Sequence, residues 1–376
     1  MPKPKVALVI GTRPEAIKMA PVVQALRTSD LVEAVLVSTG QHREILYQAL
    51  AGFDLKPDID LDIMQHGQTL AQVTCRALEG VDRVLSELQP SYVVAQGDTT
   101  TTFVAALNAF YRQIPFAHVE AGLRTETIHN PFPEEFNRRA AGLIADLHFP
   151  PTEYAAQNLL REAKDPSRIF ISGNTGIDAV MATAQAVTAN WFEEHSGQVV
   201  LLTTHRRENW GEPQVRIANA ALRIVNQNPD VLLVVAMHPN PKVRETLLPI
   251  LGNHDRIRCI EPPDYGPFVK LIQRSALILS DSGGVQEEAP AFGVPVLVLR
   301  DTTERPEGVT AGTAQLVGTE EERIVNVAND LLANPASYAK MANAVSPYGD
   351  GRASERIRYV LLRELGIESR MEEMWT

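Results

Sequence analysis

Carboxylates occur at three places in this sequence, at or near the ends of apolar runs. Asp98 follows YVVAQ, Glu120 follows PFAHV, and Glu134 and Glu135 come directly after Pro133. Carboxylates gathered at one site suit general acid–base chemistry when burial separates their pKa values. Neighbours on a helix point about 100° apart, so one of the two glutamates can face such a site, and we choose Glu134. Taken singly, each carboxylate is better explained as a helix cap or a solvated charge.

The segment GTRPEAIK places two cations where a phosphate could bind. Pro14 suits the first turn of a helix, with Arg13 at its start and Lys18 about one turn inside. An anion would also be favoured by the free N–H groups of that helix start. The alternative is a helix cap followed by two solvated charges.

The segment SDSGGVQEEAP resembles a phosphate-binding turn. Ser282 offers a hydroxyl group, and Gly283 and Gly284 allow the backbone to approach a diphosphate closely. Glu288 lies about one turn into the next predicted helix, within reach of a ribose diol. A Ser-Gly-Gly sequence is often a tight turn alone, but its position after a buried strand favours the functional interpretation.

Histidines follow two further strands, and the sequence favours no metal or cofactor. His205 precedes two arginines, which favours an anion-facing role, whereas a lone histidine such as His238 is more often structural. The run DIDLD at 58–62 contains the Asp-x-Asp pattern of metal-dependent glycosyltransferases, but it better fits an alternating strand or loop. The sequence lacks a G-x-G-x-x-G fingerprint, a P-loop, a His-Glu-x-x-His motif and a G-x-S-x-G elbow.

The elements that must position these residues alternate between short apolar runs and helical stretches. Continuous Val/Ile/Leu runs predict parallel strands covered on both faces, and their alternation with helices predicts a doubly wound α/β fold. Ligands in such sheets bind beyond the carboxyl ends of the strands. The predicted strands lie at 6–10, 34–38, 92–96, 115–119, 168–172, 199–203, 231–237, 276–280 and 295–299.

The strands fall into two groups, which predicts two Rossmann-like domains facing a central cleft. A polar, irregular stretch precedes the second group, and we place the domains at 1–170 and 171–352. The stretch 353–366 predicts an amphipathic helix. Its periodicity does not show where this helix packs.

Composition limits the partners and the compartment. The 376 residues carry a net charge of −11, which disfavours nonspecific nucleic-acid binding. Two cysteines, Cys75 and Cys259, form no disulfide framework and fit a reducing compartment. The apolar runs are too short for a signal-peptide core or a membrane span. We therefore expect a cytoplasmic protein that associates with neither nucleic acid nor membrane.

Ten motifs in order resemble those of the bacterial non-hydrolysing UDP-N-acetylglucosamine 2-epimerases. The resemblance runs from about Gly11 to Ser354. The motifs are GTRPEAIKMAPVV, TGQHRE, QGDTTTT, HVEAGLRT, PFPEEFNR, THRREN, SDSGGVQEEAP, RDTTERPEG, AGT and PYGDGRAS.

This resemblance implies a GT-B-like fold, a homodimer, and a helix over about 353–376 that returns to the N-terminal domain. It implies a UDP-sugar substrate and no cofactor. The phosphate-pocket residues would be Arg13, Lys18, Ser282, Gly283, Gly284 and Arg305. Glu288 would bind the ribose, and Phe268 and the Pro263 segment would lie by the uracil, although related sequences often carry a polar residue at Pro263. The residues around the sugar would be Asp98, Glu120, Glu134 and His205.

The resemblance also implies regulation by UDP-N-acetylglucosamine at a second site beside the first. Gly67 stands where some relatives place an arginine. The candidate residues of this second site are Gln41, Arg43, Gln68, Arg207 and His238.

The implied reaction interconverts UDP-N-acetylglucosamine and UDP-N-acetylmannosamine. The C2 proton of this sugar is not next to a carbonyl, so loss of UDP from C1 is needed to acidify it. Elimination gives UDP and 2-acetamidoglucal, and re-addition with protonation on the other face inverts C2. The alternatives are a hydrolysing epimerase, a GT-B glycosyltransferase and a nucleotide-sugar sensor without catalysis.

Overall fold

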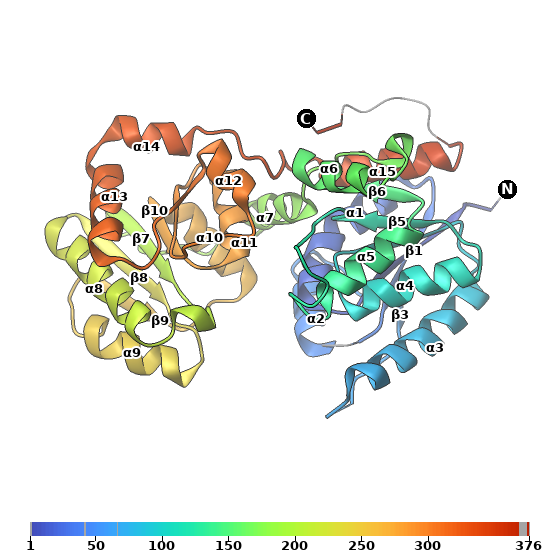
Figure 1. Cartoon of the computed structure of the whole chain (residues 1–376), viewed down its shortest axis with the longest axis horizontal. Helices are drawn as coiled ribbons and strands as arrows, with labels where there is room; N and C mark the ends of the chain where they lie inside the picture. Colours follow the sequence, from blue (N-terminus) through green and yellow to red (C-terminus); the bar gives the residue numbers. More distant parts are fainter. Residues whose placement is uncertain (1, 41–42, 66, 368–373, 376) are drawn as a thin grey trace. The chain divides into compact units, whose positions relative to one another are not determined.

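The computed structural model describes residues 2–40, 43–65, 67–367 and 374–375, and the chain divides into two compact units (Figure 1). Unit 1 comprises Met1–Ala179 and Tyr348–Thr376, and unit 2 comprises Val180–Pro347. The first crossing between the units falls inside helix α7 (Thr175–Ala186), rather than at 170/171 where the sequence analysis placed it. The helical run hides this crossing, because it continues without a change in composition.

Unit 1 is built on a six-stranded parallel sheet with the order β3-β2-β1-β4-β5-β6. Its strands are β1 (Lys5–Ile10), β2 (Glu33–Ser38), β3 (Ile59–Asp60), β4 (Tyr92–Gln96), β5 (Phe116–Val119) and β6 (Leu147–Phe149). Its other elements are α1 (Arg13–Ser29), α2 (Arg43–Ala51), α3 (Leu70–Leu88), α4 (Thr100–Tyr111), α5 (Glu134–Ile144), α6 (Glu153–Arg161), η1 (Pro166–Arg168), the start of α7, and α15 (Ala353–Glu364).

Unit 2 repeats this topology with the order β12-β11-β10-β7-β8-β9. Its strands are β7 (Gln198–Thr203), β8 (Val231–Ala236), β9 (Ile257–Ile260), β10 (Leu277–Ser280), β11 (Val296–Val298) and β12 (Ala314–Leu316). Its helices after α7 are η2 (Arg207–Asn209), α8 (Glu212–Gln227), α9 (Pro241–Leu251), α10 (Tyr265–Arg274), α11 (Gly283–Glu288), η3 (Ala289–Phe292), α12 (Pro306–Ala311), α13 (Glu321–Ala333) and α14 (Pro335–Ala342). The predicted α/β class with two Rossmann-like units is confirmed.

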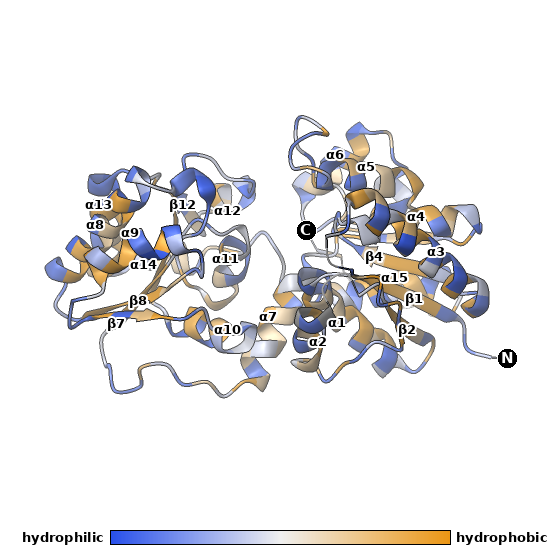
Figure 2. Cartoon of the chain, turned by 90° about the horizontal axis from the view of Figure 1, so that it is seen from below, coloured by the Kyte–Doolittle hydropathy of each residue, from blue (hydrophilic) through white to orange (hydrophobic). Residues whose placement is uncertain are grey.

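Each sheet is covered on both faces, which explains the unbroken apolar character of its central strands. In β1, Val6, Leu8 and Ile10 belong to one hydrophobic cluster, and Ala7 and Val9 belong to another. Side chains alternate across a strand, so both clusters draw on the same short run. Figure 2 shows the result as orange strands inside helices that carry both orange and blue.

The predicted strands coincide with the inner strands of both sheets but not with most of the edge strands. The edge strands β6, β9 and β12 are three or four residues long and were not predicted, and β3 lies within the run 58–62 that was interpreted as an alternating strand or loop. The predicted strand at 168–172 is wrong. Its start lies in the 3-10 turn η1, and Ile169 forms only an isolated bridge to His148. Phe170 and Ser172 each donate one backbone hydrogen bond to the chain at β6, so the segment follows the edge without extending the sheet.

Helix α15 packs into unit 1 although it follows the whole of unit 2 in the sequence (Figure 1). Its Ile357, Val360 and Leu361 are fully buried in the cluster that also contains Met19 and Leu26 of α1. Each such aliphatic side chain contributes about 1.5–3 kcal/mol when it leaves water.

Asp178 of α7 holds the first turn of α15. Its carboxylate accepts hydrogen bonds from the backbone N–H groups of Ala353 and Ser354, at 3.2 and 2.8 Å. It also accepts one from the Ser354 hydroxyl at 2.6 Å. Helix starts leave such N–H groups without intrahelical partners, so this contact fixes where α15 begins.

Replacement of Asp178 by alanine is therefore expected to lower the free energy of unfolding by about 2–3 kcal/mol, because it strands buried N–H groups. Thermal unfolding followed by circular dichroism measures the change. Glu355 of α15 is a matched control, because its ion pair with Arg358 is half exposed, and Glu355→Ala is expected to change stability by less than about 1 kcal/mol. Equal losses in the two variants would contradict the capping role.

Within the described residues, no helix is both long enough and apolar enough to cross a bilayer. Neither Cys75 nor Cys259 takes part in a disulfide.

Candidate active site

In both sheets the strand order reverses direction at one point, and the chain there carries the residues of chemical interest. In unit 1 the switch lies between β1 and β4, and in unit 2 it lies between β7 and β10. The loops that leave adjacent strands at a switch turn to opposite faces of the sheet and open a ligand crevice. The segments after these strands begin at Gly11, Gly97, Thr204 and Asp281.

At the switch of unit 1, the buried carboxylate of Glu15 joins the two loops. It accepts hydrogen bonds from the N–H groups of Gly11 and Thr12 at 2.8 and 2.7 Å. It also accepts from the hydroxyls of Thr99 and Thr102 at 2.5 and 3.2 Å. Burial raises the pKa of Glu15, and these hydrogen bonds oppose the rise.

This contact also bears on the anion site predicted at the start of α1. Two N–H groups just before the helix, those of Gly11 and Thr12, donate to Glu15. The physical reason is the Thr-x-x-Glu capping pattern at Thr12 and Glu15, in which the glutamate side chain turns back to the helix start. That pattern is readable in the sequence and was missed.

Glu120 lies at the end of β5 with both carboxylate oxygens occupied. The Lys18 ammonium is 2.6 Å from one oxygen, and the Gln96 amide donates to the other. The sequence motifs assigned Lys18 to the phosphate pocket, and in the structure its ammonium lies against a candidate catalytic acid. The Glu120 backbone has φ of 61°, in the left-handed region, which turns the chain sharply after β5.

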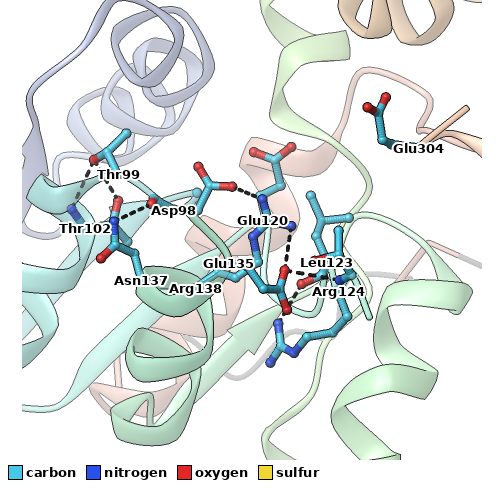
Figure 3. A network of polar contacts seen from close by, with 12 residues as sticks. Asp98, Thr99, Thr102, Glu120, Leu123, Arg124, Glu135, Asn137, Arg138 and Glu304 are labelled. Carbon is cyan, nitrogen blue, oxygen red and sulfur yellow. Dashed lines mark hydrogen bonds and ion pairs between the residues drawn. The ribbon is translucent and has the colours of Figure 1, made fainter. Parts of the chain in front are cut away.

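Asp98 belongs to a chain of ion pairs that the sequence did not reveal. The Arg138 guanidinium of α5 lies between the carboxylates of Asp98 and Glu135 (Figure 3), and its Nη1 is 3.2 Å from Glu135. The Asn137 amide also donates to the Asp98 backbone carbonyl at 3.0 Å. Two consecutive residues of α5 therefore hold the loop after β4.

Glu134 and Glu135 differ as helix geometry requires. The Glu135 side chain is fully buried and accepts from Arg139 at 2.6 Å and from the Thr125 N–H at 3.1 Å. Glu134 is partly exposed, and no hydrogen bond to it is found among the described residues. The structure thus gives Glu135 a structural environment and leaves the Glu134 carboxylate accessible. Arg13 at the start of α1 is likewise partly exposed, without an ion-pair partner in the described part of the chain.

At the switch of unit 2, Asp281 joins the loops after β7 and β10. Its carboxylate is fully buried and accepts a hydrogen bond from the Thr204 hydroxyl at 2.8 Å. His205 Nδ1 lies 3.0 Å from Asp281 Oδ1. The His205 ring stacks on that of His238 at 5.8 Å, and burial, followed by the neighbouring His205, lowers the pKa of His238.

The Ser-Gly-Gly turn of unit 2 faces two arginines. A methyl group on Gly283 would lie 3.9 Å from guanidinium nitrogens of both Arg206 and Arg305. Arg305 is oriented by an ion pair with Glu287. The Ser282 hydroxyl makes no capping bond to α11. The structure thus brings together Gly283 and Arg305, as predicted, and adds Arg206.

The other candidates of unit 2 lie on neighbouring elements. Phe268 on α10 packs against the core, and Pro263 lies in the loop before that helix. Glu288 ends α11 and is partly exposed.

The residues predicted for a second site belong to both units. Arg207 and His238 line one cavity of about 500 Å³ in unit 2, together with His205 and Trp210. The Gln68 amide in unit 1 is occupied by its own loop, since it donates to the Ile63 carbonyl and accepts from the Gln65 N–H. Gln41 lies outside the described residues, and the same holds for the side chain of Arg43. No cluster of metal-ligating side chains occurs among the residues described.

Both units have the same strand order, and two such units define a GT-B-like α/β protein. Comparison with known proteins supports this class. The family model described as UDP-N-acetylglucosamine 2-epimerase matches residues 24–362. The UDP-N-acetylglucosamine 2-epimerase of Bacillus subtilis is 49% identical over 378 residues, which covers 100% of both chains.

Solved structures agree over the full length. The crystal structure of a candidate UDP-N-acetylglucosamine 2-epimerase from Listeria monocytogenes has 49% identity and a TM-score of 0.95, covering 100% of both chains. The UDP-GlcNAc 2-epimerase from Neisseria meningitidis, solved with UDP-GlcNAc bound, has 44% identity and a TM-score of 0.84, covering 96% of this chain and 100% of that one. The chain therefore belongs to the UDP-N-acetylglucosamine 2-epimerase family, as its motifs predicted.

Proposed function

We propose that this epimerase interconverts UDP-N-acetylglucosamine and UDP-N-acetylmannosamine by elimination and re-addition of UDP, without hydrolysis. One observation carries the proposal: in this member of the family, Asp98 and Glu120 follow adjacent strands at the carboxyl end of one sheet, and Glu134 starts the helix bound to that end. Such carboxylates can move protons on a sugar ring.

A carboxylate takes the C2 proton, the C2–H electron pair forms the C1–C2 double bond, and the C1–O bond breaks with its pair leaving on UDP. For return, C2 is protonated on the opposite face while a phosphate oxygen of UDP attacks C1. Lys18 and Gln96 hold the Glu120 carboxylate and fix the direction in which it points. The Glu134 carboxylate is accessible.

Unit 2 supplies groups that suit the departing diphosphate. Gly283, between Ser282 and Gly284 in the turn, lies beside Arg206 and Arg305, and charge-assisted donors of this kind stabilise developing negative charge. We assign the ribose to Glu288 and the uracil to the Pro263 and Phe268 region, and we place His205 at the leaving group.

The test is incubation with UDP-N-acetylglucosamine in D₂O after dialysis against a chelator, with no nicotinamide added. NMR is expected to show both UDP-sugars with deuterium at C2 and no accumulating free sugar. Free N-acetylmannosamine with UDP would indicate a hydrolysing epimerase instead. Turnover only with an acceptor would indicate a glycosyltransferase, and binding without turnover would indicate a sensor.

Replacement of Arg13 by alanine is expected to remove most activity without unfolding the protein. Its partly exposed guanidinium, unpaired among described residues, is suited to a charge-assisted contact that strengthens as UDP leaves. Initial rates of epimerisation measure the loss. Arg27 in the last turn of the same helix is the control, because it pairs with Asp58 at the surface. Near-normal turnover of folded Arg13→Ala would remove Arg13 from the phosphate site.

We also propose a regulatory site that includes Arg207 and His238, supported by their shared cavity. UDP-N-acetylmannosamine alone is expected to react slowly until a little UDP-N-acetylglucosamine is added, because the effector favours the active state. Reverse-direction progress curves measure this lag. Hyperbolic kinetics without a lag would contradict the site.

A homodimer is the proposed assembly, supported by apolar side chains left exposed on adjacent helices α4 and α5. Phe110, Tyr111, Phe136 and Leu143 are 48–76% exposed, and such patches mark interaction surfaces. Light scattering is expected to give twice the 41.3 kDa chain mass, and Leu143→Glu is expected to reduce the measured mass.

We also propose a cytoplasmic location. It is supported by Cys75 and Cys259, neither of which is paired in a disulfide.

A further inference from the structure

Asp281 is a buried carboxylate of unit 2 that the reaction proposed above does not use. It follows β10 directly, with no exposed surface, and lies across the switch point from the loop after β7. A buried carboxylate is retained at low free energy only when it is fully hydrogen-bonded. Its bonding partners therefore indicate what it holds in place.

The two oxygens of Asp281 have different partners. Oδ2 accepts from the Thr204 hydroxyl at 2.8 Å, the N–H groups of His205 and Arg206 at 3.0 Å each, and the Asn209 amide at 2.9 Å. Oδ1 faces His205, with its ring Nδ1 at 3.0 Å and its backbone N–H at 3.1 Å. One oxygen thus holds the loop, and the other holds the imidazole.

The direction of the proton between Asp281 and His205 follows from this pattern. The hydrogen bonds to His205 and its neighbours lower the pKa of Asp281 against the opposing effect of burial, so the carboxylate is ionised and can only accept. His205 Nδ1 must then carry a hydrogen atom. Nε2, on the far edge of the ring, is the nitrogen left for other partners.

We infer that Asp281 is a positioning residue that fixes the orientation and tautomer of His205, so that Nε2 is the nitrogen presented to the reacting substrate. The inference rests on the proposed role of His205 at the leaving group. Neutral His205 would then offer a lone pair at Nε2 to take a proton, and protonated His205 would donate that proton to the UDP oxygen. An imidazole with the opposite tautomer could not act as the acceptor.

The surroundings of the ring support a functional interpretation. The His205 ring stacks on the His238 ring. The cavity beside it is also lined by Arg206, Arg207 and Glu208. Side chains of both charge signs from the loop of His205 therefore line this cavity, together with His238 from the end of β8. The His205 side chain is 36% exposed, so the ring is accessible while its partner is not.

The sharpest variant is Asp281→Asn, because the donors determine how the new amide must lie. The position of Oδ2 receives four donors and requires an oxygen. The NH₂ group must then take the position of Oδ1, opposite His205 Nδ1. It donates where the carboxylate accepted, so neutral His205 is expected to move its hydrogen to Nε2.

The experiment is ¹⁵N NMR of the full-length protein labelled at its nine histidines, at a pH where His205 is neutral. The His205→Gln spectrum assigns the signal. We expect the Nδ1–H tautomer in the wild type and the Nε2–H tautomer in Asp281→Asn. Thr204→Val is the matched control, because it removes a donor to Oδ2 and leaves the ring contact, and it is expected to keep the wild-type tautomer.

Turnover is then measured on the same proteins. Asp281→Asn is expected to lower kcat about tenfold or more, and to have less than about a twofold effect in a His205→Gln background. A wild-type Nε2–H tautomer would overturn the inference even if Asp281→Asn fails to fold. So would an unchanged tautomer in Asp281→Asn, or an undiminished effect of that substitution when His205 is absent. If the tautomer changes as expected while His205→Gln keeps full activity, the proposed role of His205 fails, and with it the catalytic part of this inference.

Discussion

Glu120→Gln is expected to slow epimerisation at least about 100-fold while unit 1 remains folded. The substitution keeps the shape of the side chain but removes the group that transfers a proton, and acid–base groups typically contribute at least this much. Lys18 would also lose its carboxylate partner. Similar losses are expected for Asp98→Asn and Glu134→Gln. The measurement is C2 deuterium incorporation together with release of UDP and 2-acetamidoglucal.

The matched control for these variants is Glu153→Gln in the same unit. Glu153 is exposed at the start of α6 and accepts a hydrogen bond from the Gln157 amide. Its substitution is expected to leave both turnover and thermal unfolding unchanged. If none of the three carboxylate variants loses activity, the carboxylate mechanism does not apply to this chain.

Glu135→Ala is expected to cause the largest loss of stability, roughly 3 kcal/mol. Removing one partner of a buried ion pair leaves the other charge without compensation. The value is placed at the low end of the range for such pairs because Arg139 is 39% exposed, and water can replace part of the lost contact. Denaturant unfolding followed by tryptophan fluorescence and circular dichroism measures the change.

The neighbouring residue provides the control for this prediction. Glu134→Ala is expected to leave the unfolding midpoint nearly unchanged, because Glu134 is partly exposed and makes no hydrogen bond within the described chain. A stable Glu135→Ala protein beside an unstable Glu134→Ala protein would mean that the two residues are exchanged in role.

How much of the fold the sequence predicts depends on the position of a strand in its sheet. Central strands such as β1 and β7 are buried on both faces, so their composition alone identifies them. Edge strands such as β9 bury less, and their mixed composition resembles a loop. The strand order, which creates the two switch points, depends on pairing between distant segments and left no local signal.

The candidate site shows the same division between local and distant information. Helix geometry predicts that only one of Glu134 and Glu135 faces a given site, and the two differ in burial, with Glu135 fully buried and Glu134 partly exposed. Glu15 could have been found from its capping pattern. The partners of Asp281 lie more than 70 residues before it in the sequence, and Arg138 reaches Asp98 from 40 residues away. Such contacts arise only once the sheets have assembled.

The return of α15 to unit 1 has a consequence for the order in which the protein is made. Unit 2 is one continuous stretch, Val180–Pro347, whereas unit 1 lacks part of its core until Tyr348–Leu362 has been synthesised. During translation the chain emerges from its N-terminus, and domains fold as their residues become available. Unit 1, whose synthesis begins first, therefore completes its core last. In a nascent chain arrested near residue 347, all of unit 2 has been synthesised. The α1 surface of unit 1 would still expose apolar side chains to chaperones.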